Sequence, residues 1–368
     1  MTSPAIEPSK RRTAPGPQIL AVAFRERSLC TRSGTCVGIC PEGAISLDED
    51  YYPVLDAAAC TECGKCGAIC PGGSVEFERL SHQVFDAPDD GSFDGHVLNT
   101  FIGCAGDADL HEHGTGGGVI TAIAADLLRR GEIDGCVVTR MRPEKPWMGE
   151  PFIARSGEEL AVSQGSRYTV IPLNRTLREI RQTPGRYAMI GLPCHVHGIR
   201  EAMRMEPLLA ERIVALLGIF CGGALEPAVV PELLRTKGIP LEDITDFEFR
   251  GGEWPGQMRA IFRDQPPRPV HYSNYKDGAY NYLIGIYLPQ RCQVCFDGSN
   301  LFADISVGDA WTRGEDGQYK FRSQSRVLVR SRRGQELVRR AIGSGALVLE
   351  DVSADPSYRT HKMRSKRK

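Results

Sequence analysis

The stretch Cys60-Thr-Glu-Cys63-Gly-Lys-Cys66-Gly-Ala-Ile-Cys70-Pro71 contains four cysteines in the spacing C-x2-C-x2-C-x3-C-P. Three thiolates separated by two residues each are typical ligands of one iron–sulfur cluster, and the fourth, before a proline, is typical of a ligand to a second cluster. Zinc sites instead use paired C-x2-C units that lie far apart in the sequence. The stretch therefore predicts iron–sulfur clusters and an electron-transfer protein.

A related run lies thirty residues upstream, Cys30-Thr-Arg-Ser33-Gly-Thr-Cys36-Val-Gly-Ile-Cys40-Pro41. The constant offset between the two runs indicates an internal duplication. Position 33 holds serine where the second run has Cys63. Short apolar segments at 19–24, 44–47 and 74–77 are expected to form the strands of this module.

This layout resembles the bacterial two-cluster ferredoxins, in which the fourth cysteine of each run serves the other cluster. The resemblance implies one complete [4Fe-4S] cluster, held by Cys40, Cys60, Cys63 and Cys66. It implies a second site with Cys30, Cys36 and Cys70, and with Ser33 in place of the fourth ligand. Three alternatives stay open for this second site: serine ligates iron, the site holds a three-iron [3Fe-4S] cluster, or no cluster binds. An altered ligand set should give the second site its own reduction potential.

Length, charge and cysteine usage narrow the class of protein. The 368 residues suffice for about two domains, and the formal net charge of −1 does not indicate a nucleic-acid partner. Thirteen cysteines, many of them in metal-binding spacings, and an N-terminus without an apolar signal segment favour a reducing cytoplasm. The longest apolar run, 213–220, is far shorter than the roughly 20 residues that span a bilayer. We expect a soluble cytoplasmic protein with no membrane span, beginning with a disordered tail over residues 1–18.

Residues 81–98 are rich in acids and turn formers and are expected to link two domains. Beyond them, helix and strand patterns alternate, which is typical of an α/β architecture. A glycine-rich turn, made of Gly114, Thr115, Gly116, Gly117 and Gly118, precedes an apolar helical pattern that ends near Gly131, followed by a strand at 133–138. Such a turn can present backbone N–H groups to a phosphate, although a simple turn would look the same.

Four more cysteines follow predicted strands or share one loop. Strands at 186–190 and 213–220 are followed by Cys194 and Cys221, and Cys292 and Cys295 form a C-x2-C pair. Ligands of open α/β sheets bind at the carboxyl ends of the strands. Four thiols suffice for a further cluster, but the sequence alone does not show that they converge.

Several segments resemble landmarks of the coenzyme F420 hydrogenase/dehydrogenase beta-subunit family over residues 99–347. They are Gly191-Leu-Pro-Cys194, Phe220-Cys221-Gly, Phe249-Arg250, Trp254-Pro-Gly256, Arg291-Cys-Gln-Val-Cys295 and Ala303-Asp-Ile-Ser-Val-Gly-Asp-Ala-Trp311. With a ferredoxin-like module at 19–80, the arrangement is similar to that of the input subunit of F420H2 dehydrogenases. The expected fold class is therefore an α/β (α+β) FAD-binding domain preceded by a small two-cluster ferredoxin-like domain. Residues 348–368 are expected to form a C-terminal basic tail.

The resemblance implies a bound FAD, a [4Fe-4S] cluster on Cys194, Cys221, Cys292 and Cys295, and hydride exchange with coenzyme F420. It makes the glycine turn at 114–118 and Ser166, Arg167 and Tyr168 expected FAD contacts, with Arg167 a partner for the pyrophosphate. A flavin joins two-electron hydride chemistry to one-electron carriers, so no catalytic side chain is expected. Ferredoxin or a partner redox subunit would exchange electrons with the clusters.

Other interpretations also fit the sequence. One is a ferredoxin-dependent flavoenzyme that reduces a conjugated organic substrate, as chlorophyll-precursor reductases do, and another is a non-catalytic electron-wiring subunit. His195 and His197 could form a zinc site with Cys194, act in a proton relay, or be ordinary hydrogen-bonded histidines. Cys104 and Cys136 lack partner spacing and are expected to be buried thiols. The basic run 359–368 is either a solvated tail or a docking segment for an acidic partner.

Overall fold

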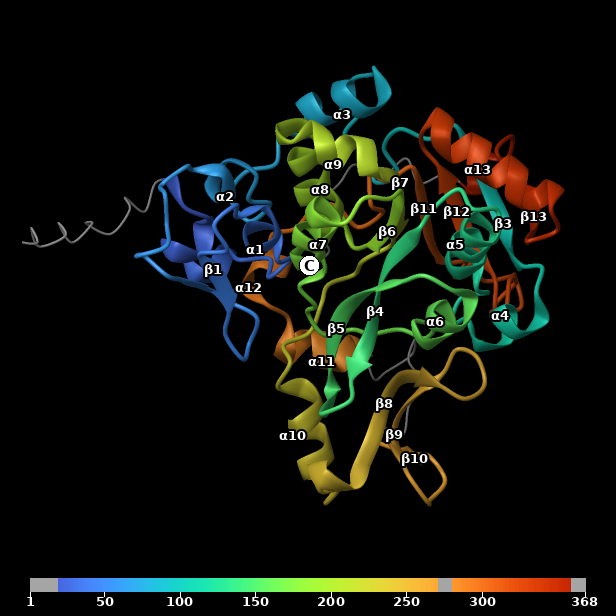
Figure 1. The fold of residues 1–368 in the computed structure, drawn as a ribbon. Coiled ribbons are helices and arrows are strands. Elements are labelled where there is room, and N and C mark those ends of the chain that lie inside the picture. The colour runs from blue at the N-terminus through green and yellow to red at the C-terminus, as the bar shows by residue number, and fades with distance from the viewer. Residues whose placement is uncertain (1–18, 271–279, 359–368) are drawn as a thin grey trace, which may run out of the picture.

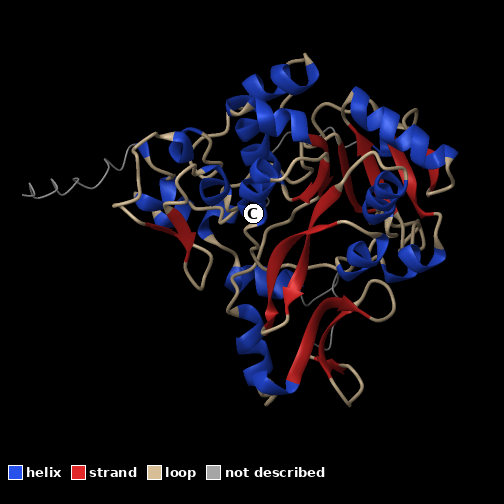
Figure 2. Cartoon of the chain, in the orientation of Figure 1, coloured by secondary structure: helices blue, strands red, loops and turns tan. Residues whose placement is uncertain are grey.

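The computed structural model describes residues 19–270 and 280–358. A small N-terminal module lies beside a mixed eight-stranded sheet that carries helices on both faces, and a three-stranded sheet extends from it (Figures 1 and 2). The mixed α/β class expected from the sequence is confirmed. The predicted N-terminal tail (1–18) and the basic run 359–368 lie outside the described residues, as does part of the tyrosine-rich segment near 272–287.

The strands are β1 Ile45–Leu47, β2 Pro53–Leu55, β3 Asn99–Ala105, β4 Gly135–Arg142, β5 Lys145–Ala154, β6 Tyr187–Gly191, β7 Ile213–Ile219, β8 Ile244–Gly251, β9 Gln257–Phe262, β10 Arg268–Pro269, β11 Ile305–Asp309, β12 Ser325–Val329 and β13 Leu347–Asp351. The α-helices are α1 Thr35–Ile39, α2 Lys65–Ala68, α3 Phe77–Phe85, α4 Ala108–His113, α5 Val119–Arg129, α6 Gly157–Val162, α7 Leu177–Gln182, α8 Pro193–Met205, α9 Pro207–Arg212, α10 Val229–Thr236, α11 Tyr280–Tyr287, α12 Gln290–Gln293 and α13 Arg332–Gly343. Three short 3-10 helices also matter below, η2 Val22–Phe24, η3 Arg27–Leu29 and η4 Leu173–Thr176.

The large sheet has the strand order β13-β3-β12-β11-β7-β6-β4-β5. Its centre is parallel, because β11, β7, β6 and β4 pair in the same direction, whereas the outer strands pair antiparallel. Parallel strands place their carboxyl ends at one edge, where α/β sheets bind ligands. This edge is where Cys194 and Cys221 follow β6 and β7.

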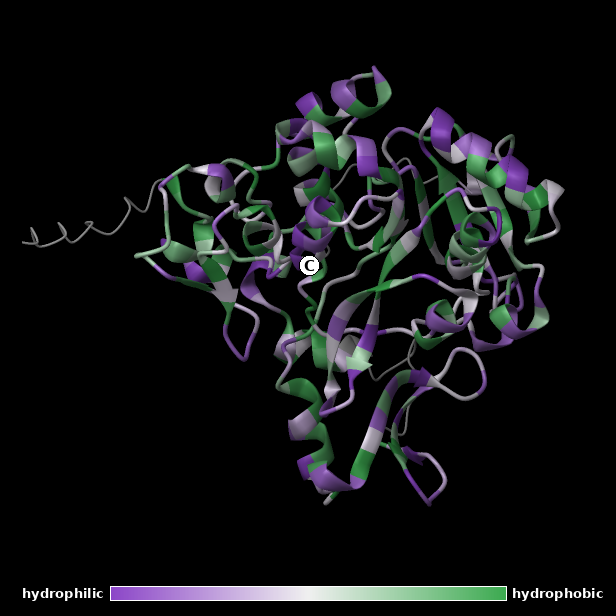
Figure 3. Ribbon diagram, in the orientation of Figure 1, coloured by the Kyte–Doolittle hydropathy of each residue, from purple (hydrophilic) through white to green (hydrophobic). Residues whose placement is uncertain are grey.

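The two faces of the sheet bury different helices because strand side chains alternate. In β4, Val137 belongs to the core beneath α7, α8 and α9, whereas Cys136 and Val138 belong to the core beneath α5 and α13. The central strands are accordingly green along much of their length in Figure 3, as expected for strands buried on both faces. No helix in the described ranges is long and apolar enough to cross a membrane.

The N-terminal module shares one hydrophobic core with the α7–α8 face of the large domain. Val37 and Ile39 of α1 pack in the same core as Leu177 and Ile180. Gly38 allows this approach, since a Cβ there would lie 2.1 Å from the backbone oxygen of Asn174. The module is therefore docked by close backbone packing, not by the linker alone.

Three local expectations differ from the structure. Residues 19–24 contain η2 instead of a strand, and the segment 74–77 leads into α3. The local pairing explains this difference, because residues of β1 pair with residues of β2 that lie six to ten positions downstream, and not with the second half of the duplication. The large sheet also continues beyond residue 347, since β13 pairs with β3 through Asp351. Its Leu347 is buried in the sheet core, so part of the expected tail is an ordered edge strand.

Candidate functional site

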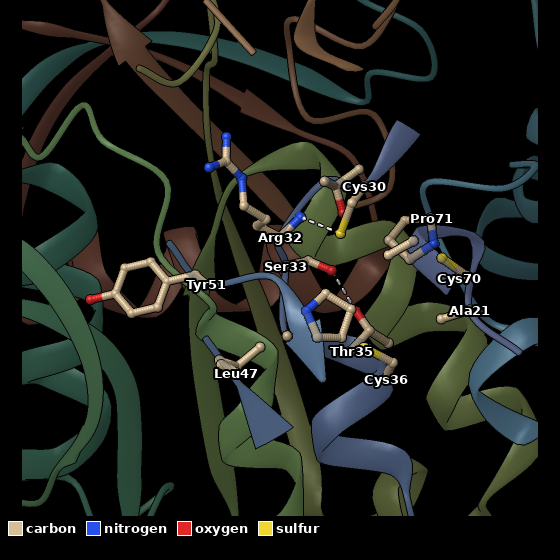
Figure 4. Close-up of a pocket in the computed structure, with 14 residues that line it drawn as sticks. Ala21, Cys30, Arg32, Ser33, Thr35, Cys36, Leu47, Tyr51, Cys70 and Pro71 are labelled. Atoms are coloured by element: carbon tan, nitrogen blue, oxygen red, sulfur yellow. Dashed lines mark hydrogen bonds between the residues drawn. The ribbon is translucent and has the colours of Figure 1, made fainter. Parts of the chain in front are cut away.

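Cys30, Cys36 and Cys70 line one small pocket together with Ser33 (Figure 4). We call this group the serine site. Burial raises the pKa of Cys30 to about 11, and the nearby Cys70 adds to the rise while Arg32 opposes it. The structure thus brings together the crossed set that the ferredoxin resemblance implies, one run supplying two thiols and the other supplying the third.

Cys40, Cys60, Cys63 and Cys66 line a second small pocket, which we call the complete site. Burial raises the pKa of Cys66, and the thiols at 40, 63 and 60 raise it further. Cys63 is exposed, so the complete site reaches the protein surface. Four thiols around one small cavity match the donor set of a cubane iron–sulfur cluster.

The hydroxyl of Ser33 has protein partners of its own. Its Oγ lies 2.8 Å from Thr35 Oγ1, and Asn174 Nδ2 donates to the same threonine oxygen at 2.8 Å. Asn174 Nδ2 also donates to the carbonyl of His195. Ser33 is buried and lines the cavity wall, but its oxygen belongs to a chain of hydrogen bonds that continues into the large domain.

Cys194, Cys221, Cys292 and Cys295 form a third group, the C-terminal site. Cys194 lies in the first turn of α8 after β6, Cys221 follows β7, and the remaining two lie in and just after α12. Burial raises the pKa of Cys194 well above its usual range, and the thiols at 221, 292 and 295 raise it further. That mutual effect requires short separations. The structure therefore brings together the four cysteines that the sequence could only suggest.

The thiols of each group line a pocket or influence one another's pKa, and they do not converge on a single ion. The described residues contain no group of three or more His, Cys, Asp or Glu that could bind a metal ion. Both ring nitrogens of His195 form hydrogen bonds, since the Leu192 N–H donates to Nδ1 and Nε2 donates to the Ile171 carbonyl. Burial also lowers its pKa to about 4. His197 pairs with the buried Asp297 at 2.9 Å. Both residues are hydrogen-bonded histidines, and the zinc alternative finds no support here.

The serine site lies between the other two groups. Cys66 of the complete site contributes to the pKa of Cys36, so these two sites are neighbours. On the other side, α12 contacts η3, and Arg291 donates to the carbonyl of Pro71 at 3.3 Å. Figure 1 shows the same order, with α1 between α2 and the large domain and α12 beside the module. The three sites therefore lie in series, with the complete site first, the serine site in the middle and the C-terminal site last.

The expected flavin residues lie around the start of α5. Thr115 Oγ1 and Ser166 Oγ are 2.9 Å apart, so the glycine turn and the 165–168 segment meet. Gly117 and Gly118 have φ values of 94° and 73°, which side chains disfavour. The N-terminus of an eleven-residue helix favours bound anions through its dipole and its N–H groups.

Arg167 and Tyr168 have different surroundings from those expected. The Arg167 guanidinium donates to the carbonyls of residues 162, 163, 164 and 165 at the end of α6. Its Nε has no hydrogen-bond partner among the described residues, and burial lowers its pKa to about 10. Tyr168 packs edge-to-face on Phe249 in the core of the small sheet. In this structure Arg167 closes a helix end, and its contact with a pyrophosphate stays a prediction.

An arginine that sequence reasoning noted only as a family landmark supports the glycine turn. Arg250 of β8 forms two hydrogen bonds with Asp309 of β11, at 2.9 and 3.0 Å, and a third with the carbonyl of Thr115 at 2.8 Å. Its side chain is 2% exposed. Only the segments Phe249-Arg250 and Gly308-Asp309 hinted at this pair, because 59 residues separate its members.

Aromatic rings continue outward from Arg250. The rings of Trp254 and Trp311 stack with centroids 5.2 Å apart, and Tyr319 packs edge-on to both. We call these three residues the aromatic cluster. Arg250 lies over the Trp311 ring, and Trp254 Nε1 is a buried donor without a partner among the described residues. Flat rings, arginines and an unsatisfied N–H suit a planar, hydrogen-bonding, anionic ligand.

Comparisons with known proteins agree with this geometry. A family model described as "4Fe-4S dicluster domain" matches residues 29–74. Two further models describe the N-terminal and the C-terminal part of the coenzyme F420 hydrogenase/dehydrogenase beta chain, and they match residues 100–178 and 185–355 respectively.

Similar curated proteins include one of the subunits of the F(420)H(2) dehydrogenase of Methanosarcina mazei, 27% identical over 86% of this chain and 89% of the relative. The coenzyme F420-dependent sulfite reductase of Methanocaldococcus jannaschii is 23% identical over 85% of this chain, which spans 46% of that relative. A chain of the F420-reducing [NiFe] hydrogenase complex from Methanosarcina barkeri has a similar fold, with a TM-score of 0.56 and 20% identity over 70% of this chain and 83% of that one. The chain belongs to the coenzyme F420 hydrogenase/dehydrogenase beta-subunit family, and it carries an N-terminal 4Fe-4S dicluster domain.

Proposed function

We propose that this protein is a cytoplasmic iron–sulfur flavoprotein that transfers electrons between coenzyme F420 and ferredoxin or a partner redox subunit. The observation that carries the proposal is the series of three groups of thiols, together with a glycine turn that Arg250 joins to the aromatic cluster. A flavin would supply the exchange between hydride and single-electron chemistry, and the clusters would supply one-electron carriers. Family membership supports F420 as the hydride partner, as the names of several relatives include it.

The residues of this chain would have distinct roles. The complete site and the C-terminal site each offer four thiols and would hold [4Fe-4S] clusters. The serine site offers three thiols, and the hydroxyl of Ser33 is engaged by Thr35. We therefore propose a [3Fe-4S] cluster there, among the alternatives that the sequence leaves open.

FAD would bind across the glycine turn and the aromatic cluster. Arg250 would fix the Thr115 carbonyl and orient the turn, while Asp309 compensates its buried charge. The hydroxyls of Thr115 and Ser166, the free N–H of Trp254 and the start of α5 would supply polar contacts. This role for Arg250 is one of positioning.

Anaerobic reconstitution with iron, sulfide and FAD tests the proposal. The replete protein should oxidise reduced F420 with a viologen as acceptor, and the restored F420 absorbance reports the reaction. A protein with flavin and clusters intact that never exchanges electrons with F420 would remove the assignment. A protein with clusters but without affinity for any flavin would instead be an electron-wiring subunit.

A matched pair of variants tests the flavin site. Arg250→Gln should lower the FAD content, because it breaks the buried pair with Asp309 and releases the Thr115 carbonyl. Arg259→Gln breaks a more exposed pair with Glu248 in the same small sheet and should leave FAD content unchanged. Equal FAD contents in the two variants would argue against flavin binding at this place.

A further inference from the structure

We propose that the ion pair between Arg32 and Glu226 tunes the reduction potentials of the serine site and the C-terminal site. The inference rests on the proposed function, since it requires clusters at both sites. It goes further because it assigns a role in tuning reduction potentials to two residues that ligate no metal in the proposed function. Arg32 belongs to the N-terminal module and Glu226 to the large domain, 194 positions later.

The pair has the geometry of a rigid clamp. Both guanidinium nitrogens of Arg32 donate to the two carboxylate oxygens of Glu226, each at 2.7 Å. The Arg32 side chain is 1% exposed and that of Glu226 is 34% exposed. A bidentate arginine–carboxylate pair fixes orientation as well as distance. The planar guanidinium also stacks over the Tyr52 ring at 4.6 Å.

The pair joins the two loops that carry the thiols. The backbone N–H of Arg32 donates to Cys30 Sγ at 3.4 Å, and Ser33 follows it directly. Glu226 follows Cys221 in the segment between β7 and α10, and its N–H donates to the Tyr287 carbonyl. Loss of the pair would therefore remove one of the contacts that hold the serine-site loop in place, while the Asn174 N–H would still donate to the Ser33 carbonyl.

The same guanidinium acts electrostatically on both sites. The backbone N–H of Arg32 contacts Cys30 Sγ of the serine site. Glu226 lies two residues after Ala224, and Cys292 of the C-terminal site packs in the same cluster as Ala224. A positive charge favours the reduced, more negative state of a nearby redox centre, and a buried charge acts more strongly than an exposed one. In the pair, Glu226 moderates what Arg32 would otherwise do to both potentials.

A second pair provides an internal control on the other side of the module. Lys65 Nζ and Glu206 Oε1 are 2.8 Å apart, and they too join the module to the large domain. Lys65 lines the complete site, next to Cys66. Glu206 also lies 3.4 Å from Arg181 Nε, so neutralising it leaves two cations uncompensated. The complete site should shift weakly, because the Lys65 side chain is 36% exposed.

Anaerobic redox titration of the reconstituted full chain, followed by electron paramagnetic resonance, separates the cases. Glu226→Gln keeps the shape and leaves the Arg32 charge uncompensated, so the potentials of the serine-site and C-terminal clusters should shift upward while the complete site stays fixed. Arg32→Met should shift the same two potentials downward. Glu206→Gln should move the complete site upward, by less, and leave the C-terminal site fixed.

Two results would overturn the inference. One is a loaded Glu226→Gln protein whose potentials all match the wild type, and the other is an equal shift of all three clusters. If Glu226→Gln fails to bind its clusters, Glu226→Asp, which keeps the charge, must bind them and retain wild-type potentials. If both variants fail while Glu206→Gln binds its clusters normally, the pair has only a folding role, and this result also overturns the inference. Absence of iron and sulfide from the wild type is a different outcome, which removes the proposed function itself.

Discussion

The cysteine loops in the two halves of the N-terminal duplication share their backbone conformation at matched positions but face different surroundings. Arg32 and Glu62 occupy equivalent positions with φ values of 52° and 56°, and Gly34 and Gly64 match with 78° and 72°. Yet Arg32 is buried against the large domain, whereas Glu62 is exposed. The half that lacks a fourth cysteine is thus the half whose cysteine loop is buried against the large domain. Where the second half has an exposed thiol, the first half has contacts that join the module to the large domain.

The largest expected effect comes from deleting a ligand of the complete half. Cys66→Ala removes one of four thiols at a buried position, and we expect loss of the whole cluster, roughly four irons per chain. Iron analysis and paramagnetic resonance would check this loss. Cys104→Ala is the control, since that cysteine belongs to none of the three sites, and it should retain all of the iron. Unchanged iron in Cys66→Ala would show that the cavity is not a cluster site.

A reciprocal exchange tests whether residue 33 decides the cluster type. Ser33→Cys should add about one iron and turn the serine site into a four-iron centre, because the thiolate supplies the missing ligand. Cys63→Ser should do the reverse at the complete site. Paramagnetic resonance of the anaerobic proteins distinguishes three-iron from four-iron signals. Identical spectra for Ser33→Cys and the wild type would mean that residue 33 does not control the occupancy.

Backbone contact at the docked half should be less tolerant than at a free turn. Gly38→Ala would place a Cβ 2.1 Å from the Asn174 oxygen, so we expect a loss of about 1–3 kcal/mol in the free energy of unfolding. Gly73→Ala meets its nearest atom at 3.4 Å and serves as the matched control. Urea unfolding of both variants measures the difference. Equal stabilities would contradict tight docking through α1.

The smallest expected effect distinguishes the polar contacts of the two halves. Thr35 and Lys65 are equivalent positions that contact Asn174 and Glu206 respectively. Thr35→Val should cost about 1–2 kcal/mol, because it leaves the buried Asn174 donor and the Ser33 hydroxyl short of a partner. Lys65→Met should cost less than about 1 kcal/mol, since its pair is partly exposed. A reversed order in urea unfolding would mean that the second half carries the docking.

Much of this organisation was predictable because its signals are local. The resemblance to two-cluster ferredoxins implied the crossed thiol sets whose members line the two pockets, and the strand–cysteine segments predicted β6 before Cys194 and β7 before Cys221. The family resemblance is confirmed over residues 100–178 and 185–355. The FAD contacts and the cluster ligation stay predictions.

Other features were missed because their partners are distant in sequence. Arg32 and Glu226 lie 194 positions apart, and Arg250 and Asp309 lie 59 apart, so no periodicity or spacing connects them. Arginine is common on surfaces, and only the fold reveals that these two are buried. The expected strand at 19–24 was wrong. Its apolar residues, such as Leu20, pack in the hydrophobic core around the thiols and do not pair with another strand.

The most direct measurement is metal and sulfide analysis, combined with paramagnetic resonance, of the full chain purified without oxygen. Iron and acid-labile sulfide should be present together, with a three-iron signal from the serine site and four-iron signals from the other two. Zinc in place of iron, or no acid-labile sulfide, would contradict an electron path through these cysteines.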